Sequence, residues 1–413
     1  MTSPFHLFEV FGIELEYMIV DRRSLRVAPI ADKLILKACG SFQEEIERGA
    51  TCWSNELALH VIELKTNGPA ADLASLGSIF HQQVGEANLM LEEWSACLMP
   101  SAMHPFMVPE RDMKLWPHGR SEVYEAFNRI FNCKGHGWSN LQSMHINLPF
   151  ANDAEFGALH AAIRVLLPIL PALAAGSPIQ EGKLTGACDT RLKVYQTNQA
   201  RIPSIAGEVI PEPVWNEKQY NEEIFSKVYK DIEPLDPEKV LQHEWLNSRG
   251  AIARFDRSAI EIRVVDVQES PSVDIAFATA IVAALRGLVD QSSQDVEHQK
   301  NWKSHDLKKI FDSAVNVGSQ TKLDETYTRI FGLKKDCTAR ELWNHILEQS
   351  LTKYFPSIPV KSTQALTTYL KHGTLAERMI KSTPHGSLEE MSDVGRQLCR
   401  CLMNDQIFLT IQG

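Results

Sequence analysis

A short alternating stretch at residues 11–17, Phe-Gly-Ile-Glu-Leu-Glu-Tyr, constrains the fold of this chain more than any other feature. Side chains of a β-strand alternate between its faces, so the apolar residues point one way and Glu14 and Glu16 point the other. A rise of about 3.3 Å per residue places these two carboxylates roughly 6.5 to 7 Å apart. They repel each other unless solvent or cations lie between them. Taken alone, the stretch is typical of a surface strand with a solvated acidic face.

Three later stretches repeat this pattern of charge within an apolar strand and change that interpretation. Residues 53–66 carry Glu56 and Glu63, residues 140–150 carry His145, and residues 259–266 carry Glu261 and Arg263. Glu56 and Glu63 are seven positions apart, so an unbroken strand would place them on opposite faces. We therefore expect a bend between them, with Glu63 inside a strand and Glu56 on the segment that leads into it.

If the four stretches share one sheet, their polar faces form a cluster of carboxylates with a guanidinium and an imidazole. Hard oxygen ligands in this number suit Mg²⁺ or Mn²⁺ rather than zinc. Two or three such ions suit a nucleoside triphosphate, and arginine is the expected partner of its phosphates. The chain has no GxxxxGK[ST] loop and no strand-linked GxGxxG, so metals and arginines would have to hold the phosphates. This chemistry allows ATP-driven activation of a carboxylate, or phosphorylation of another acceptor.

Simpler interpretations remain for individual residues. His145 could be a satisfied core histidine, and Arg263 could form a plain ion pair with Glu261, its neighbour on the same strand face. Arg191 follows a polar, glycine-bearing loop at 176–186, where a solvated arginine is ordinary. Arg254 lies close to the fourth alternating stretch, from which we expect it to reach a substrate or nucleotide.

The order of patterns predicts an α+β protein: a catalytic body at 1–290, in which strands and helices alternate, and a helical region at 291–413 packed on it. Residues 202–237 are rich in proline and charge, and we expect a long loop or lid there, bordering the site and containing one short helix over 221–229. Apolar periodicity predicts helices over 30–39, 73–98, 121–131, 154–174, 275–288, 304–317, 339–347, 363–372 and 387–403.

Charge and cysteine usage exclude several classes of protein. A net charge of −10 argues against a nucleic-acid binder, which needs a basic face for phosphates. No apolar run reaches the ~18 residues needed to span a bilayer, and the first ten residues lack the features of a signal peptide, so we expect a cytoplasmic protein. The eight cysteines are scattered without a CxxC pair, which favours free thiols over zinc or a disulfide framework.

Six motifs also occur in the order found in a known family. They are Phe11-Gly12-Ile13-Glu14-Leu15-Glu16, the segment 56–66, His104-Pro105-Phe106, Met144-His145-Ile146-Asn147, Ser177-Pro178 and Ile260-Glu261-Ile262-Arg263-Val264. With them, residues 8–285 resemble the type 2 glutamate–cysteine ligase (carboxylate–amine ligase) family. The resemblance implies a glutamine-synthetase-like fold, a curved and mainly antiparallel sheet whose inner face holds Mg²⁺ and ATP.

The same resemblance assigns roles to residues of this chain. Glu14, Glu16, Glu56, Glu63, His145 and Glu261 match metal-ligating positions, Arg263 a position that contacts the phosphate and the reacting carboxylate, and Arg191 one that handles substrate or nucleotide phosphates. Ser143 stands where some members have a second histidine, and the 202–237 segment is absent from shorter relatives. Both departures concern the identity of the amine substrate.

The implied reaction joins a carboxylate, glutamate in the family, to an amine such as cysteine through an acyl phosphate made with ATP. The resemblance also makes a homodimer reasonable. Two other functions stay open on the residues alone: a kinase acting on a guanidino or carboxylate acceptor, and a catalytically silent relative that binds nucleotide or a partner protein. A requirement for both a carboxylate and an amine would separate the ligase from the kinase.

Overall fold

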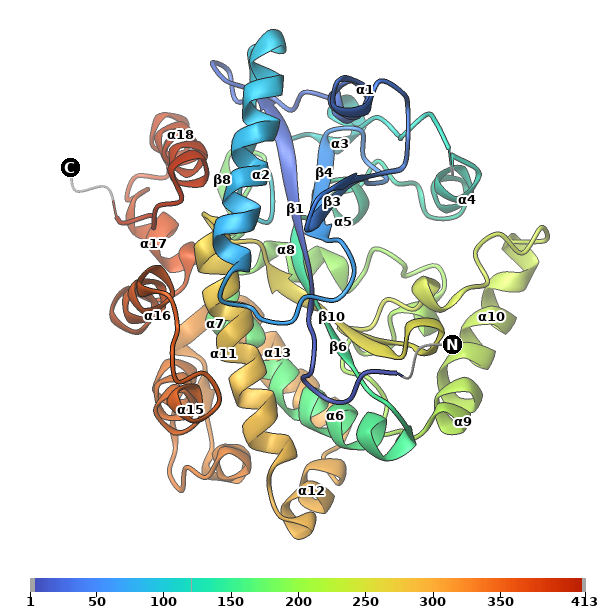
Figure 1. Cartoon of the computed structure of the whole chain (residues 1–413), viewed down its shortest axis with the longest axis vertical. Helices are drawn as coiled ribbons and strands as arrows, with labels where there is room; N and C mark the ends of the chain where they lie inside the picture. The colour runs from blue at the N-terminus through green and yellow to red at the C-terminus, as the bar shows by residue number, and fades with distance from the viewer. Residues whose placement is uncertain (1–3, 120, 411–413) are drawn as a thin grey trace.

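The computed structural model describes residues 4–119 and 121–410. Within these residues, eight strands form one antiparallel sheet in the order β2-β3-β4-β1-β6-β10-β9, with β5 also paired to β1. The strands are β1 Gly12–Asp21, β2 Glu45–Arg48, β3 Thr51–Asn55, β4 Val61–Thr66, β5 Ala96–Met99, β6 Ser143–Pro149, β9 Ala251–Arg254 and β10 Ala259–Asp266. β1 lies in the middle of the sheet, between β4 and β6, and extends from the centre of the molecule toward its upper end in Figure 1. The predicted α+β class with a mainly antiparallel sheet is confirmed.

One face of the sheet is apolar and packs on two long helices, α2 (Leu76–Leu91) and α11 (Pro271–Val289). Ile13, Leu15 and Tyr17 of β1 are fully buried on this face, as the alternation predicts. The Tyr17 hydroxyl donates to Asp274 Oδ2 of α11 at 3.4 Å. In Figure 1 α2 runs beside β1, and α11 lies below α2. The apolar half of each alternating stretch therefore builds the core and leaves the charged half on the opposite face.

A glycine in β1 allows the two central strands, β1 and β6, to approach each other closely. Gly12 pairs with Asn147 of β6, and a Cβ at Gly12 would lie 2.9 Å from the Cβ of Asn147. A larger residue at position 12 would push β6 away from β1, so glycine keeps the polar faces of these two strands in contact.

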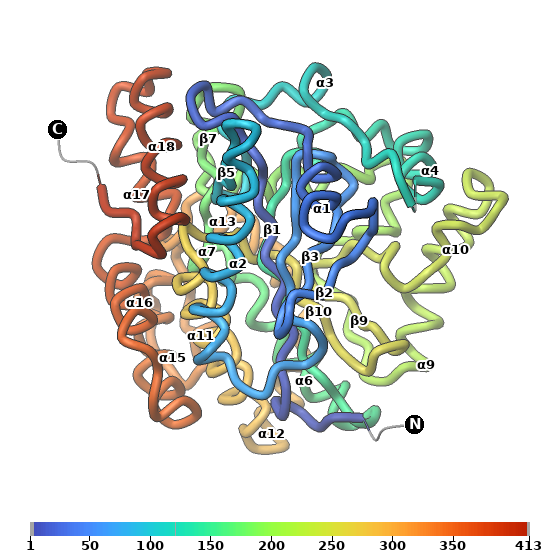
Figure 2. Tube along the Cα trace, turned by 45° about the horizontal axis from the view of Figure 1, so that its top comes forward, coloured from blue at the N-terminus to red at the C-terminus, as the bar shows by residue number. Residues whose placement is uncertain are grey.

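Helices surround the sheet and make up most of the chain beyond residue 270 (Figures 1 and 2). They include α1 Ala31–Cys39, α3 Pro109–Asp112, α4 Ser121–Phe131, α5 His136–Ser139, α6 Asp153–Leu166, α7 Leu170–Ala174, α8 Thr190–Tyr195, α9 Glu217–Tyr220, α10 Ser226–Ile232, α12 Ser293–Lys300, α13 Ser304–Val317, α14 Glu325–Thr328, α15 Ala339–Tyr354, α16 Val360–His372, α17 Leu375–Lys381 and α18 Leu388–Asn404. The helix predicted over 304–317 is confirmed with those bounds, and those predicted over 275–288, 363–372 and 387–403 are confirmed with shifts of one to four residues at their ends. The helix predicted over 339–347 is present but continues seven residues further, to Tyr354. Two small two-stranded sheets, β7 Ile179–Gln180 with β8 Lys183–Leu184 and β11 Lys322–Leu323 with β12 Cys337–Thr338, lie outside the main sheet.

Two local predictions are corrected. The helix expected over 73–98 ends near Trp94, and Ala96–Met99 is strand β5, because its backbone pairs with β1. The segment at 202–237 is more helical than expected: the short helix over 221–229 is present, and helical turns run without a break from Glu217 to Leu235 through α9, a π-helical turn and α10. The stretch at 53–66 contains two strands, β3 and β4, on either side of the expected bend.

A single hydrophobic core joins the sheet to the helical C-terminal region. Trp343 of α15 and Tyr369 of α16 belong to the same buried cluster as the β1 side chains, through contacts with α11. Two helical stretches, Asp153–Ala174 and Pro271–Val289, are long and apolar enough to cross a membrane, but 94% and 78% of their most apolar windows are buried inside the protein. Helices at the centre of a protein core have the same composition, and both stretches pack in this way.

A buried histidine of α6 makes the stability of the fold depend on pH. His160 is fully buried, its Nδ1 lies 2.9 Å from the carbonyl oxygen of Val214, and its ring stacks on Phe156. Burial, together with the charge of Arg164, lowers the pKa of His160 to about 3. The unfolded chain binds a proton at this histidine below about pH 6.5, whereas the folded chain does not until pH 3, so stability falls as the pH drops through this window.

We expect this effect to appear as a difference between the native protein and His160→Gln. Between pH 6 and 4, the free energy of unfolding of the native protein should fall more steeply, by about 1 kcal/mol per pH unit. Urea unfolding at several pH values measures both slopes. The other titrating groups are the same in the native protein and the variant. Equal slopes would therefore show that His160 does not cause the loss of stability at low pH.

Candidate active site

The register of the sheet brings the predicted ligands together on its polar face. Glu16 of β1 lies opposite Glu63 of β4, and Glu14 of β1 lies between Lys65 of β4 and His145 of β6. Residues opposite each other in an antiparallel pair project to the same side. We call the face that carries Glu14, Glu16, Glu63, His145 and Glu261 the acidic face. Three of these carboxylates are well buried, with Glu16, Glu63 and Glu261 exposed by 7%, 6% and 3%.

Hydrogen bonds from β6 orient the two glutamates of β1. His145 Nδ1 lies 2.8 Å from Glu14 Oε2, and Asn147 Nδ2 donates to Glu14 Oε1 at 3.1 Å. Ser143 donates to Glu16 Oε2 from its backbone nitrogen at 2.6 Å and from its hydroxyl at 3.0 Å. The same hydroxyl lies 2.9 Å from His145 Nε2. Ser143 therefore links the Glu16 carboxylate to the imidazole.

The connection between β3 and β4 supplies two more carboxylates. Glu63 lies inside β4 and Glu56 directly follows β3, so the predicted bend between them is confirmed. Ser54 Oγ donates to Glu63 Oε2 at 2.5 Å, and Lys65 Nζ lies 3.3 Å from the same oxygen. Lys65 also forms an ion pair with Glu45 of β2 at 2.5 Å. The ammonium of Lys65 thus lies at the edge of the acidic face.

Two arginines flank Glu261 on the other side of the face. Arg263 Nε donates to Glu261 Oε1 at 2.6 Å, and Arg254 Nη1 lies 3.7 Å from Glu261 Oε2. Arg254 also donates twice to Asp256, at 3.1 and 2.9 Å. The ion pair between Arg263 and Glu261 that the simpler interpretation required is therefore present. It lies beside the carboxylate cluster, with His145 Nδ1 3.8 Å from Glu261 Oε1.

Arg191 is buried against the end of β10 rather than on an open loop. It is the second residue of α8, is only 2% exposed and forms an ion pair through Nε with Asp266, the last residue of β10. Its Nη2 donates to the carbonyl oxygen of Arg263 at 3.3 Å. The β10 register shifts between Ile262 and Val265, so this carbonyl lies within a bulge. Arg191 thus supports the bulge from which Arg263 projects.

The crowding of carboxylates shifts their protonation. Burial and the charges of Glu16 and Glu63 raise the pKa of Glu56 well above its usual value. Burial and the charge of Glu14 raise the pKa of Glu63 to about 7. Burial opposes ionisation of Glu14 and His145 as well, but their mutual hydrogen bond and charges prevail, giving a pKa of about 2 for Glu14 and about 9 for His145. Glu56 and Glu63 therefore hold a proton more tightly than ordinary carboxyl groups, whereas Glu14 is ionised and paired with a protonated His145.

The donor set fits hard divalent cations. One oxygen or nitrogen from each of Glu14, Glu63 and His145 lies within 4.8 Å of the others, and the same holds for Glu16, Glu56 and Glu63. Glu63 belongs to both groups, so two adjacent cation positions would share it. Five of the six predicted ligands fall in these groups. Glu261 lies beside them, held by Arg263.

Several polar residues of this site were not expected from the sequence. Ser54 and Lys65 contact Glu63, Asn147 contacts Glu14, and Asp266 holds Arg191. A β3–β4 hairpin assigned in advance would have placed Ser54 opposite Glu63. Asp266 gave no such signal, because its partner is 75 residues away in sequence.

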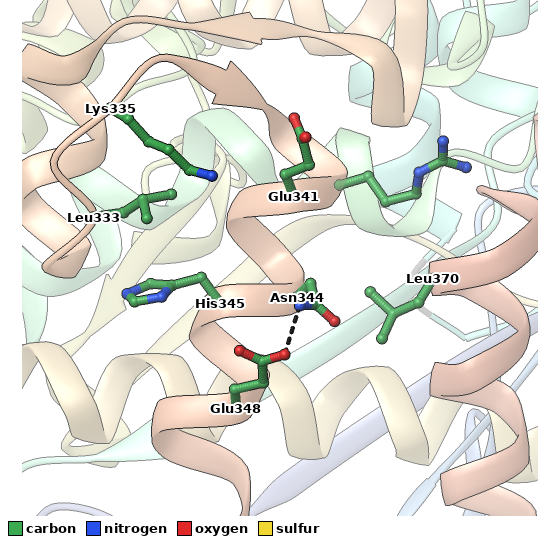
Figure 3. A pocket seen from close by; sticks show the side chains of 8 residues that line it. Leu333, Lys335, Glu341, Asn344, His345, Glu348 and Leu370 are labelled. Carbon is green, nitrogen blue, oxygen red and sulfur yellow. Dashed lines mark hydrogen bonds between the residues drawn. The ribbon is translucent and has the colours of Figure 1, made fainter.

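A surface hollow of about 390 Å³ lies elsewhere, in the helical C-terminal region (Figure 3). Its lining includes Lys335, Glu341, His345 and Glu348, and Asn344 donates to Glu348 at 2.7 Å. No residue of the acidic face lines it. The predicted site residues gather on the sheet, and the hollow adds nothing to them.

Comparisons with known proteins concern the family and the fold of this chain. A protein of uncharacterised function from Archaeoglobus fulgidus is 33% identical over 400 residues, covering 97% of this chain and all of that protein. The crystal structure of a glutamate–cysteine ligase from Francisella tularensis in complex with AMP superposes with a TM-score of 0.60 at 12% identity, over 95% of this chain and 89% of that chain. A bifunctional glutathione synthetase from Pasteurella multocida superposes with a TM-score of 0.56 at 14% identity, over 96% and 52%.

At such low identities the two structural matches show a shared fold. The family itself follows from the sequence, since the model of glutamate–cysteine ligase family 2 (GCS2) matches residues 10–393. The resemblance drawn from the six short motifs is confirmed over nearly the whole length. The chain belongs to glutamate–cysteine ligase family 2.

Proposed function

We propose that this protein is an ATP- and Mg²⁺-dependent carboxylate–amine ligase that forms an amide through an acyl phosphate, with glutamate and cysteine as its substrates. The observation that carries the proposal is the pair of cation positions sharing Glu63, flanked by Arg254 and Arg263. Glutamate–cysteine ligation would place the protein in glutathione biosynthesis. We further propose that it acts in the cytoplasm, as a homodimer.

The residues present fit the metal ions that this chemistry needs. Glu14, Glu63 and His145 would hold one Mg²⁺ or Mn²⁺, and Glu16, Glu56 and Glu63 would hold another. Bound there, the ions would neutralise the phosphates of ATP and the charge that develops during transfer. The raised pKa of Glu56 and Glu63 supports this assignment, because burial and the charges of neighbouring glutamates cause it, and a bound cation would offset both.

The remaining chemistry falls to side chains of the protein. The carboxylate of glutamate attacks the γ-phosphorus of ATP, giving the acyl phosphate and ADP, and the amine then attacks the acyl carbon and phosphate leaves. Arg263 would stabilise the charge on the transferred phosphoryl group, since its guanidinium forks to two oxygens at once. Arg254 would contact the nucleotide or substrate from the neighbouring strand, β9. Arg191 would act on the phosphates through the position of Arg263.

The 202–237 segment is proposed to border the reacting groups and exclude water. Although mostly helical, it contacts β9, because the Tyr220 hydroxyl accepts from the backbone nitrogen of Ala253 at 3.1 Å and from Asn247 Nδ2 at 2.7 Å. Asn247 in turn offers its carbonyl oxygen to Arg263 at 3.5 Å. Excluding water at this edge would protect the acyl phosphate from hydrolysis.

Phosphate release tests the proposed reaction. We expect the protein with ATP and Mg²⁺ to release phosphate only when glutamate and an amine are both present, with cysteine the most active of a panel of amino acids and small amines. Mass spectrometry of the products should show the dipeptide, and chelation of the metal with EDTA should stop its formation.

Two other outcomes would overturn the ligase assignment. A stable phosphorylated product made without any amine would identify a kinase. Magnesium-dependent nucleotide binding without turnover on any carboxylate and amine pair would identify a silent relative. Turnover with glutamate and a different amine would keep the ligase and correct only the second substrate.

A further inference from the structure

The acidic face continues beyond Glu16 as an apolar surface. Met18 and Val20 of β1 follow on the same side of the strand, and their partners on β5 are Met99 and Cys97. Met18, Val20, Cys97 and Met99 form one buried cluster with Leu25. Cys399 of α18 packs against this cluster from outside the sheet. A free cysteine of the strand and a free cysteine of the helix thus meet at the same cluster.

The approach of α18 to β5 places the two cysteines opposite each other. At Gly395 the helix backbone comes so close that a Cβ would lie 3.3 Å from Met99 Cε and 3.0 Å from Leu25 Cδ1. Cys399 lies one turn further along α18, about 6 Å away at 1.5 Å per residue. Cys97 lies two residues from Met99 on the same strand face, about 7 Å away. Cys399 packs against the cluster that contains Cys97, so the two cysteines lie close together, and Figure 2 shows α18 beside β5.

The pKa values of the two thiols are also shifted in opposite directions. The Cys399 thiol hydrogen-bonds to the Cys97 sulfur, and this bond, with the charge of Arg22, lowers the pKa of Cys97 despite its burial. The same contact raises the pKa of Cys399. Cys97 is 8% exposed and Cys399 is partly exposed, so a small oxidant can reach the pair from the surface. Cys97 would be the nucleophile and Cys399 the resolving thiol.

We propose that Cys97 and Cys399 form an oxidation site at which a hydroperoxide converts the two thiols into a disulfide. The Cys97 sulfur attacks the peroxide, the O–O bond breaks, one water leaves and a sulfenic acid forms. The Cys399 sulfur then attacks that sulfur, the S–O bond breaks and a second water leaves. Two thiols and one hydrogen peroxide thus yield one disulfide and two waters. This site is independent of the ligase chemistry proposed above.

The bond would tie the C-terminal helix to the strand next to β1. It would close a loop of about 300 residues, from Cys97 to Cys399, and a crosslink that spans so much chain restricts the unfolded state strongly. We therefore expect the oxidised protein to unfold at a higher temperature than the reduced protein, by about 5 °C.

Peptide mapping of the full-length protein tests the proposal. The native protein is treated with hydrogen peroxide in slight excess, its remaining thiols are alkylated, and the digest is analysed by mass spectrometry. We expect a peptide pair joined through Cys97 and Cys399, its loss after dithiothreitol, and a matching rise in the thermal midpoint. Cys97→Ser and Cys399→Ser should each abolish both signals.

Cys401→Ser is the matched control, because Cys401 lies two residues from Cys399 and outside the cluster that holds Cys97. This variant should keep the crosslink and the shift. Three results would overturn the proposal: a disulfide between Cys399 and Cys401, oxidation of Cys97 to its sulfinic acid with no crosslink, or a crosslink that leaves the thermal midpoint unchanged.

Discussion

Glu16→Gln is expected to abolish amide formation, lowering kcat/KM by about 10³-fold or more, while the protein stays folded. Glu16, Glu56 and Glu63 form one of the two cation positions, and a neutral amide removes the charge that this position needs. The local hydrogen bonds survive the change, because a glutamine oxygen can still accept from the backbone nitrogen and hydroxyl of Ser143. The loss should therefore fall on cation binding rather than on the sheet.

Measurements of cation binding and of thermal unfolding distinguish a loss of cation binding from damage to the sheet. Titration with Mn²⁺, followed by electron paramagnetic resonance, should show weaker binding in Glu16→Gln and in Glu63→Gln. Without cations, both variants should be at least as stable to heat as the native protein, since each removes one of several carboxylates that repel one another. Glu47→Gln is the matched control, because Glu47 is exposed on β2 and belongs to neither cation position. Near-normal turnover in Glu16→Gln would refute the metal assignment.

The sequence was sufficient to predict β1, β6, β10 and the polar residues that they carry. A strand with one buried face must alternate, and a charge repeated on its other face is visible in a short window. The bend between Glu56 and Glu63 followed from the same period. The register of the strands, and with it the residues that face each other across neighbouring strands, could not be predicted. Register depends on partner strands that are distant in sequence.

The errors have the same physical origin. Ala96–Met99 is a short apolar run that continues the helical spacing of α2, and only pairing with β1 makes it a strand. The 202–237 segment has a composition typical of loops, yet burial of Tyr220 and Phe225 stabilises its helical turns. Tertiary contacts decided both cases, and a single sequence does not reveal them.

Arg191 shows most clearly what could not be predicted from the sequence. Its contact with Asp266 is also the basis of the second prediction with a large expected effect. Its motif position suggested direct contact with phosphates, but its guanidinium is buried against Asp266, which also accepts from the backbone nitrogen of Gly176 at 2.8 Å and from Ser177 Oγ at 2.9 Å. Removing one partner of a buried ion pair leaves the other charge uncompensated. Asp266→Asn should therefore lower the free energy of unfolding by about 3 to 5 kcal/mol.

The activity of Arg191 variants should then reflect the geometry of Arg263. Arg191→Lys keeps a positive charge near Asp266 but cannot both pair with Asp266 and donate to the Arg263 carbonyl at the β10 bulge. We expect a fall in kcat of about tenfold or more with the KM for ATP nearly unchanged, because Arg263 is misaimed while the cation positions stay intact. Steady-state kinetics at varied ATP, with urea unfolding of the same samples, gives both quantities. A large rise in the KM for ATP at unchanged kcat would instead place the Arg191 guanidinium on the nucleotide, which would require the ion pair with Asp266 to open when ATP binds.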